Sequence, residues 1–225
     1  MTSSIPSSST ALVRTSHPWT AAESAAGFVL RYLIPMREQL IPWLGSEALA
    51  DECVKRLVAH LVAKGFGDHG KGRIRDFLMR GIRSAAKSAL ADIPEAERPK
   101  VDFSTWSADS PTWLANWRQG LLARAWRSLE RLEHKDLSKP LYSVLRMATE
   151  HPDDDATMLV VRINMQTDLN VDKDKIRELL GPAKTVFAEM LELEISETLE
   201  LADPVSLMRE IEALSLTGIF ATSKS

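Results

Sequence analysis

Apolar side chains recur three and four residues apart along most of this 225-residue chain. The pattern is clear at Leu57, Val58 and Leu61, and it returns in residues 77–82 and 121–132. An α-helix places such positions on one face, so this spacing predicts helices. No stretch shows the two-residue alternation of a half-buried strand, and no Asn-Gly or Asp-Gly pair indicates a hairpin. The sequence therefore predicts an all-α protein.

Proline, glycine and polar clusters divide the chain into two predicted helical lobes. Gly181-Pro182 is expected to interrupt an otherwise long helix, because proline lacks a backbone donor and crowds the preceding turn. The predicted parts are a disordered Ser/Thr-rich arm (1–18), a first helical domain (19–92), a linker (93–112), a second helical domain (113–214) and a flexible tail (215–225).

Composition places the chain among globular proteins of a reducing compartment. Hydrophobic residues make up 44% and charged residues 26%, and no apolar run is long enough to cross a membrane. The first 17 residues lack the apolar stretch of a secretion signal. A single cysteine, Cys53, excludes an internal disulfide and is expected to be a small buried side chain. We therefore predict a cytoplasmic protein with no membrane partner.

Sites for enzymatic chemistry are not found in the sequence. The five histidines have no partners at metal-ligand spacing, and the glycine-rich segment 65–72 lacks the Gly-Lys-Ser/Thr ending of a phosphate-binding loop. That segment is better explained as a turn between helices. Asp153, Asp154 and Asp155 are expected to cap a helix. We predict a protein that is not an enzyme, with no catalytic residue, cofactor or metal.

Charge is distributed unevenly along the chain, whose net charge is −3. Residues 55–87 hold nine basic and two acidic side chains, a local charge of +7. Residues 186–215 hold eight acidic side chains and one basic, a local charge of −7. The basic segment indicates an anionic partner or a protein-binding surface, and the alternative is a solvated helix face.

Five separated blocks resemble, in order, one protein family. They are Phe28–Tyr32 with Leu40–Leu44, Ala50–Val58, Gly72-Arg-Ile-Arg-Asp-Phe-Leu78, Trp113–Trp117 with Leu121-Leu122, and Leu169–Ser196. The third block is similar to a family motif that runs GRFRTFL. Together the blocks resemble the extracytoplasmic-function RNA polymerase sigma factors of the planctomycete type, over most of the chain.

The resemblance implies a sigma region 2-like bundle, a linker and a region 4-like lobe with a helix-turn-helix. It implies a sigma-70-like transcription initiation factor that binds core RNA polymerase and directs it to promoter DNA, with an anti-sigma or other regulatory protein as a further partner. The polymerase-binding positions would be Asp51, Glu52, Lys55 and Arg56. The DNA-binding positions would be Arg73, Arg75, Arg80, Arg83, Lys87, Lys173, Lys175 and Arg177.

The chain departs from the family in two of these regions. Lys55 and Arg56 stand where the family has a glutamine and an acid, and Gly181–Val186 replaces a basic HRLRRR segment. The acidic residues that follow would repel a duplex. The alternative is therefore a non-enzymatic helical adaptor or regulatory protein, derived from a sigma factor, that has lost sequence-specific DNA binding. In such a protein the acidic segment could dock on the basic one as an autoinhibited state.

Three further expectations concern individual side chains. Trp113 and Trp117 are four residues apart on an amphipathic helix, which predicts core positions. Trp106, in the predicted linker, is the one tryptophan expected to be available for stacking on a base. Asp172 is expected to cap the second helix of the helix-turn-helix.

Overall fold

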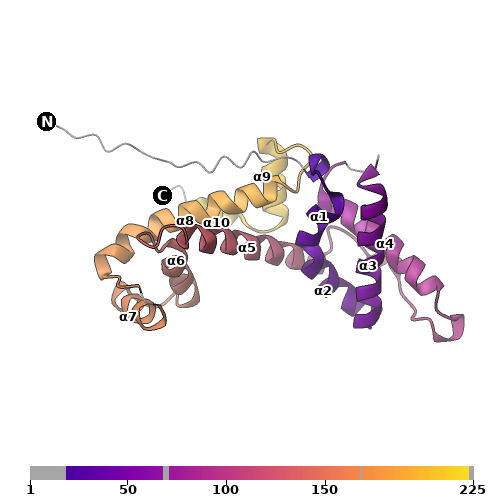
Figure 1. Ribbon diagram of the computed structural model, residues 1–225, viewed down its shortest axis with the longest axis horizontal. Coiled ribbons are helices and arrows are strands. Elements are labelled where there is room, and N and C mark those ends of the chain that lie inside the picture. The colour runs from indigo at the N-terminus through magenta and orange to yellow at the C-terminus, as the bar shows by residue number, and fades with distance from the viewer. Residues whose placement is uncertain (1–18, 68–70, 168, 223–225) are drawn as a thin grey trace.

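The computed structural model describes residues 19–67, 71–167 and 169–222, and within these ranges the protein is helical (Figure 1). The predicted all-α fold is confirmed. The predicted arm 1–18 lies outside the described residues, as do residues 68–70 in the predicted glycine-rich turn. The principal helices are α1 (Ala25–Val29), α2 (Leu33–Leu44), α3 (Glu47–Lys64), α4 (Ile74–Ala91), α5 (Pro111–Glu133), α6 (Leu141–Glu150), α7 (Ala156–Gln166), α8 (Lys173–Ser196), α9 (Pro204–Ala213) and α10 (Thr217–Thr222).

Local side chains fix where the helices start. The side chains of Ser46, Ser110, Asp155 and Asp172 accept hydrogen bonds from the first free backbone amides of α3, α5, α7 and α8. These amides have no partner within their own helix, so each cap stabilises it by about 1 kcal/mol. The predictions that Asp172 and one of the three consecutive aspartates cap helices are confirmed. Gly45, with φ of 66°, ends α2 in the left-handed conformation that glycine adopts easily.

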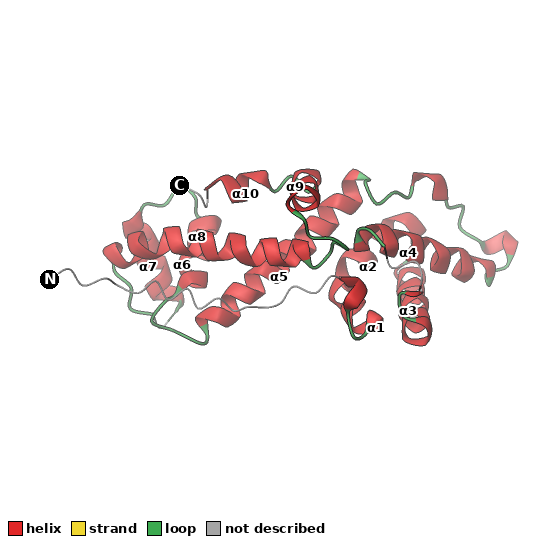
Figure 2. Ribbon diagram, turned by 90° about the horizontal axis from the view of Figure 1, so that it is seen from above, coloured by secondary structure: helices red, strands yellow, loops and turns green. Residues whose placement is uncertain are grey.

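The long helix α5 lies in the middle of the molecule. It packs against α2 towards one end and against α6 and α8 towards the other, an arrangement seen in both views (Figures 1 and 2). The helices α3 and α4 continue the first group, and α7 packs on α6 and α8 in the second. The buried residues of both groups belong to one connected apolar cluster. A division into two separate lobes therefore stays a prediction.

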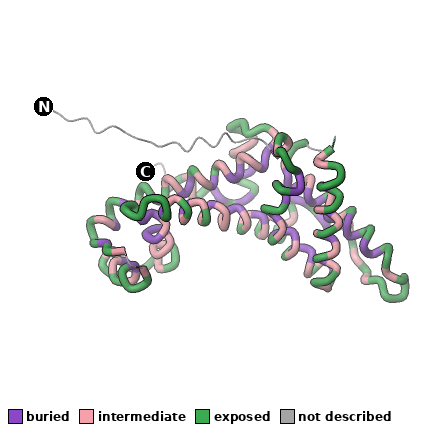
Figure 3. The backbone as a smooth tube through the Cα atoms, in the orientation of Figure 1, coloured by how far each residue is buried: buried purple, intermediate pink, exposed green. Residues whose placement is uncertain are grey.

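Aromatic side chains fill the contact between α5 and the first group. Trp113 and Trp117 are at most 1% exposed, and the Trp117 ring stacks on Tyr32 with centroids 4.5 Å apart. The core positions predicted for the two tryptophans are confirmed. Figure 3 shows buried residues along the whole length of α5. Cys53 is also fully buried, and this burial raises the pKa of its thiol to about 11.

The structure differs from three expectations, two about the backbone and one about Trp106. The helix α8 continues through Gly181 and Pro182, because its apolar face, including Leu179 and Ala183, is buried on both sides of the proline. Part of the predicted flexible tail forms α10, anchored by the buried Leu216. Trp106 is 3% exposed and stacks on Trp43 at 4.3 Å, so it is a core side chain and offers no free face to a base.

Candidate functional site

A shallow apolar groove of about 540 Å³ lies between α2 and α3. Its lining is almost entirely apolar, with charged side chains at the rim. The lining residues are Leu30, Leu33, Ile34, Arg37, Asp51, Val54, Lys55, Val58 and Ala59. We refer to these residues as the α2–α3 groove.

Ion pairs hold the two walls of the groove together. Arg37 on α2 donates from Nε to Oδ1 of Asp51 at 2.6 Å and from Nη2 to Oε2 of Glu47 at 2.8 Å. Both acids lie near the start of α3, which the tight turn at Gly45 brings back alongside α2. The hydrogen bond from Arg37 holds the pKa of Asp51 below its usual range, so this carboxylate stays charged at neutral pH.

Large apolar side chains in the groove face solvent. Leu30 is 50% exposed and Ile34 is 62% exposed. Exposed apolar side chains grouped in a concavity and surrounded by charges are typical of protein-binding sites. The groove offers an apolar floor for a partner helix and a rim of both charges to orient it.

Of the four predicted polymerase-binding residues, the structure brings two into the groove. Asp51 and Lys55, one helical turn apart, both line it. Glu52 and Arg56 lie on the neighbouring side of α3, towards α4. There Arg56 is paired with Glu52 at 2.8 Å and with Asp92 at 2.6 Å. Arg56 therefore helps to join α3 to α4.

Leu30 and Ile34 were not predicted from the sequence as exposed groove residues. Leu30 lies in the short 3-10 helix Leu30–Tyr32, and Ile34 lies in the first turn of α2. Their neighbours Phe28 and Tyr32 are buried, so the apolar residues of this segment divide between the core and the surface. The available signal was an excess of apolar residues over what one core-facing stripe uses.

The predicted DNA-binding residues at the start of α4 are mostly internal. Arg75 is 0% exposed and pairs with Glu210 of α9 at 2.6 Å and with Asp109 at 2.7 Å. In this structure Arg75 is therefore a core ion-pair residue and does not reach a duplex, which corrects the expectation. Arg73 is 33% exposed and is paired with Asp76 at 2.7 Å. Through Arg75 and Glu210 the basic segment contacts the acidic one, and an autoinhibited state stays a prediction.

The remaining predicted positions on α4 are more open. Arg80 is exposed and lines a pocket of about 430 Å³ between α3 and α4. Arg83 is half-buried and donates to the backbone carbonyls of Phe103 and Trp106, which fixes the loop before α5. Lys87 is exposed, with its ammonium 5.4 Å from the centre of the Phe103 ring. Arg80 and Lys87 remain available to an anionic partner.

The start of α8 carries the other predicted DNA-binding residues. The helices α7 and α8 follow one another in the chain and pack together, and a helix-turn-helix at this place stays a prediction. Lys173 is exposed at the first turn of α8. Lys175 lies 3.4 Å from Glu178, and Arg177 lies 3.4 Å from Asp174. These surface pairs reduce the positive charge that α8 presents.

Comparisons with protein-family models, with curated proteins and with solved structures find no match to this chain. None of the helices in the described ranges is both long and apolar enough to span a membrane. Within residues 19–67, 71–167 and 169–222, no group of three or more histidines, cysteines and carboxylates is placed to hold a metal ion.

Proposed function

We propose that this protein is a sigma-70-like transcription initiation factor that binds core RNA polymerase and directs it to promoter DNA. The observation that supports the proposal best is the α2–α3 groove. The family resemblance assigns polymerase docking to the helix that contains Asp51 and Lys55. The same two side chains stand at the rim of an apolar groove in which Leu30 and Ile34 face solvent.

The groove fits a helical partner. The exposed side chains of Leu30 and Ile34 both line the groove, and a helix laid in it would bury both. Buried anchors at the centre of an interface carry most of the binding free energy, often 2 kcal/mol or more each. Asp51 and Lys55 supply opposite charges at the rim, which favour one orientation of the partner over the other.

The first experiment measures the affinity of the full-length protein for purified core RNA polymerase at two salt concentrations. We expect submicromolar binding, and we expect Ile34→Asp to weaken it by roughly 30-fold, which corresponds to about 2 kcal/mol. Met165→Asp is the matched control, because Met165 is 82% exposed on α7, outside the groove. It should leave the affinity unchanged.

Two outcomes would overturn the proposal. One is no detectable binding to core polymerase. The other is a loss of affinity in Met165→Asp as large as that in Ile34→Asp, since the interface would then not be the groove. If the protein binds core polymerase, the next experiment is run-off transcription from promoter DNA.

A helical adaptor without sequence-specific DNA binding is the second candidate. It is favoured by the burial of Arg75 and by the pairing of Lys175 and Arg177 with neighbouring acids. The adaptor would use the same groove for a different protein. Polymerase binding without run-off transcription would support it.

A further inference from the structure

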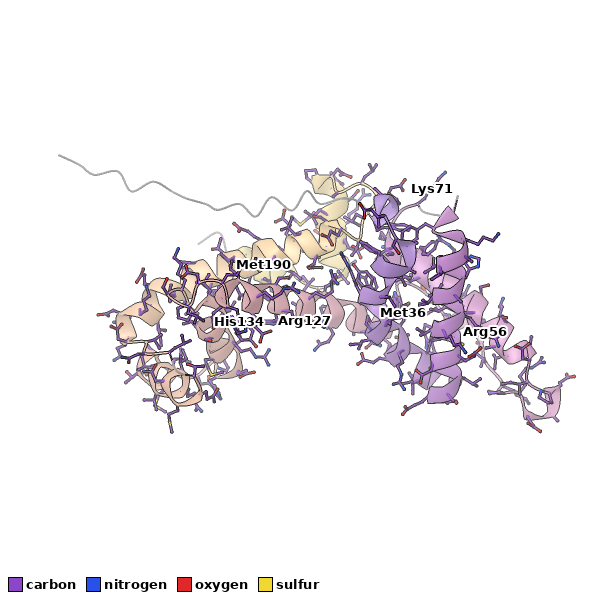
Figure 4. The ribbon with its side chains drawn as sticks, in the orientation of Figure 1. Met36, Arg56, Lys71, Arg127, His134 and Met190 are labelled. Carbon is purple, nitrogen blue, oxygen red and sulfur yellow. The ribbon has the colours of Figure 1, made fainter. Side chains whose placement is uncertain are left out.

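A cluster of arginines lies where the turn before α2 meets α5 and α8. Arg31, in the turn before α2, meets Arg124, Arg127 and Arg131 of α5 around a small polar pocket of about 140 Å³. One acid, Glu194 of α8, completes the lining. Figure 4 labels Arg127 on α5, between His134 at the end of that helix and Met36 on α2.

The inner two arginines of the cluster are held rigidly. Arg124 is bonded to Glu194, and its guanidinium lies 5.4 Å from the centre of the Tyr32 ring. Arg31 pairs with Glu197 at 2.7 Å and lies 4.8 Å from the centre of the Phe28 ring. These contacts fix the positive charge at the base of the pocket without removing it from the surface, because Arg31 is still 38% exposed.

The other two arginines of the cluster, Arg127 and Arg131, face solvent, where they can contact an anion. Arg127 and Arg131 are exposed and lie one helical turn apart on the same side of α5. Arg131 donates to the hydroxyl of Ser128 at 3.0 Å. Across the part of the chain that the structure describes, neither arginine has a carboxylate within ion-pair distance. Glu194 lines the same pocket and is bonded to Arg124, so the four arginines of the lining exceed its one acid.

We infer that this cluster, the α5 arginine site, binds the phosphodiester backbone of nucleic acid. Guanidinium groups bind phosphate oxygens in a bidentate manner, and they do so without regard to base sequence. The row from Arg124 to Arg131 extends about 10 Å along the helix axis. A DNA strand carries one phosphate per 3.4 Å of helix rise, so exposed cations spread over this length can contact more than one phosphate.

The inference rests on the promoter-DNA part of the proposed function and deepens it by adding a DNA contact that uses none of the residues predicted from the sequence. A backbone contact on α5 would hold DNA alongside the middle of the molecule, between α2 and the helices α7 and α8. This contact would supply affinity for DNA of any base sequence. The basic residues at the start of α8 supply less of it, because Lys175 and Arg177 are paired with neighbouring acids. The isolated chain is sufficient to test it, so its outcome is separate from that of the polymerase experiment.

The test is the salt dependence of binding of the full-length protein to a fluorescent mixed-sequence DNA duplex, measured by anisotropy from low to moderate salt. Each phosphate contact contributes about 0.9 to the slope of log K against log salt concentration. We expect the double variant Arg127→Gln with Arg131→Gln to reduce that slope by about 2. Glutamine keeps a similar stem and helix propensity, so the fold should be retained.

The matched control removes the same charge elsewhere on the surface. Lys139→Gln with Arg146→Gln also deletes two exposed cations, at and near α6, and should leave the slope unchanged. The inference is overturned if the duplex does not bind at low salt, or if the two double variants change the slope equally. Circular dichroism of both variants verifies that they are folded.

Discussion

Arg75 and Glu210 lie 135 positions apart in the sequence and form a bidentate ion pair in the interior of the protein. Nε of Arg75 is 2.6 Å from Oε1 of Glu210, and Nη2 is 3.1 Å from Oε2. The two side chains are 0% and 2% exposed. Next to them, a single antiparallel bridge joins Arg73 to Leu199. The pair thus fastens α9 to the start of α4.

Removing one partner of this pair should cost far more stability than removing both. Arg75→Met leaves the Glu210 carboxylate buried with only Arg73, 3.7 Å away, so we expect the free energy of unfolding to fall by about 3–5 kcal/mol. Glu210→Leu should cost less, because Arg75 keeps Asp109 at 2.7 Å. The double variant should lose much less than the sum, because apolar side chains of similar volume replace the pair. Urea denaturation of the four proteins measures the cycle, and additive losses would show that the two residues are not coupled.

Truncation after Ser196 distinguishes an integral α9 from an autoinhibitory one. The truncated chain lacks Glu210 and leaves Arg75 with Asp109 as its remaining carboxylate partner. We therefore expect its melting temperature to fall by several degrees or more, as measured by circular dichroism. An autoinhibitory segment would instead come away without loss of stability, and the truncated protein would bind DNA more tightly at low salt.

Asp109 should make stability depend on pH in the acidic range. Its hydrogen bond with Arg75 lowers the pKa of the carboxyl below the usual value of 3.8, so the folded state favours the charged form. The stabilisation is present above pH 3.8 and is lost as pH falls through the lower folded-state pKa. Asp109→Asn should thus be less stable than the parent at pH 7, and the difference should shrink as pH falls below 3.8. A difference that stays constant with pH would contradict this.

Two glycines in helix interiors should respond in opposite ways to the same substitution. A Cβ on Gly81 would lie 2.7 Å from Cδ1 of the buried Leu57, whereas one on Gly181 would meet nothing within 4 Å. Gly81→Ala should therefore destabilise the α3–α4 contact by about 1–3 kcal/mol through overpacking. The higher helix propensity of alanine offsets up to about 1 kcal/mol of this loss. Gly181→Ala should stabilise the protein by up to about 1 kcal/mol. Thermal unfolding of both variants measures the difference, and equal shifts would show that Leu57 yields without cost.

The features that the sequence predicted correctly are local. Asp172 caps α8 because its side chain reaches an amide three residues away, and Trp113 and Trp117 face the core because they are one turn apart on a single helix. Such interactions depend on neighbouring residues, so spacing alone predicts them. The same reasoning failed at Pro182, where the local cost of a proline is outweighed by the burial of α8 on α5 and α6.

The features that the sequence could not predict depend on distant partners. The burial of Arg75 is decided by Glu210, which lies 135 positions away. A basic residue in a basic segment is typical of a surface position, and nothing near Arg75 in the sequence indicates otherwise. The α5 arginine site likewise requires Arg31 to meet a helix that begins 80 residues later.

The ion pair between Arg75 and Glu210 also has a consequence for synthesis on the ribosome. At about 5–20 residues per second, the 135 residues that separate the partners take roughly 7–27 seconds to translate. During that interval α4 has emerged and Arg75 has only Asp109 of its two carboxylate partners. The first helical group therefore completes its contact with α9 only when the end of the chain arrives.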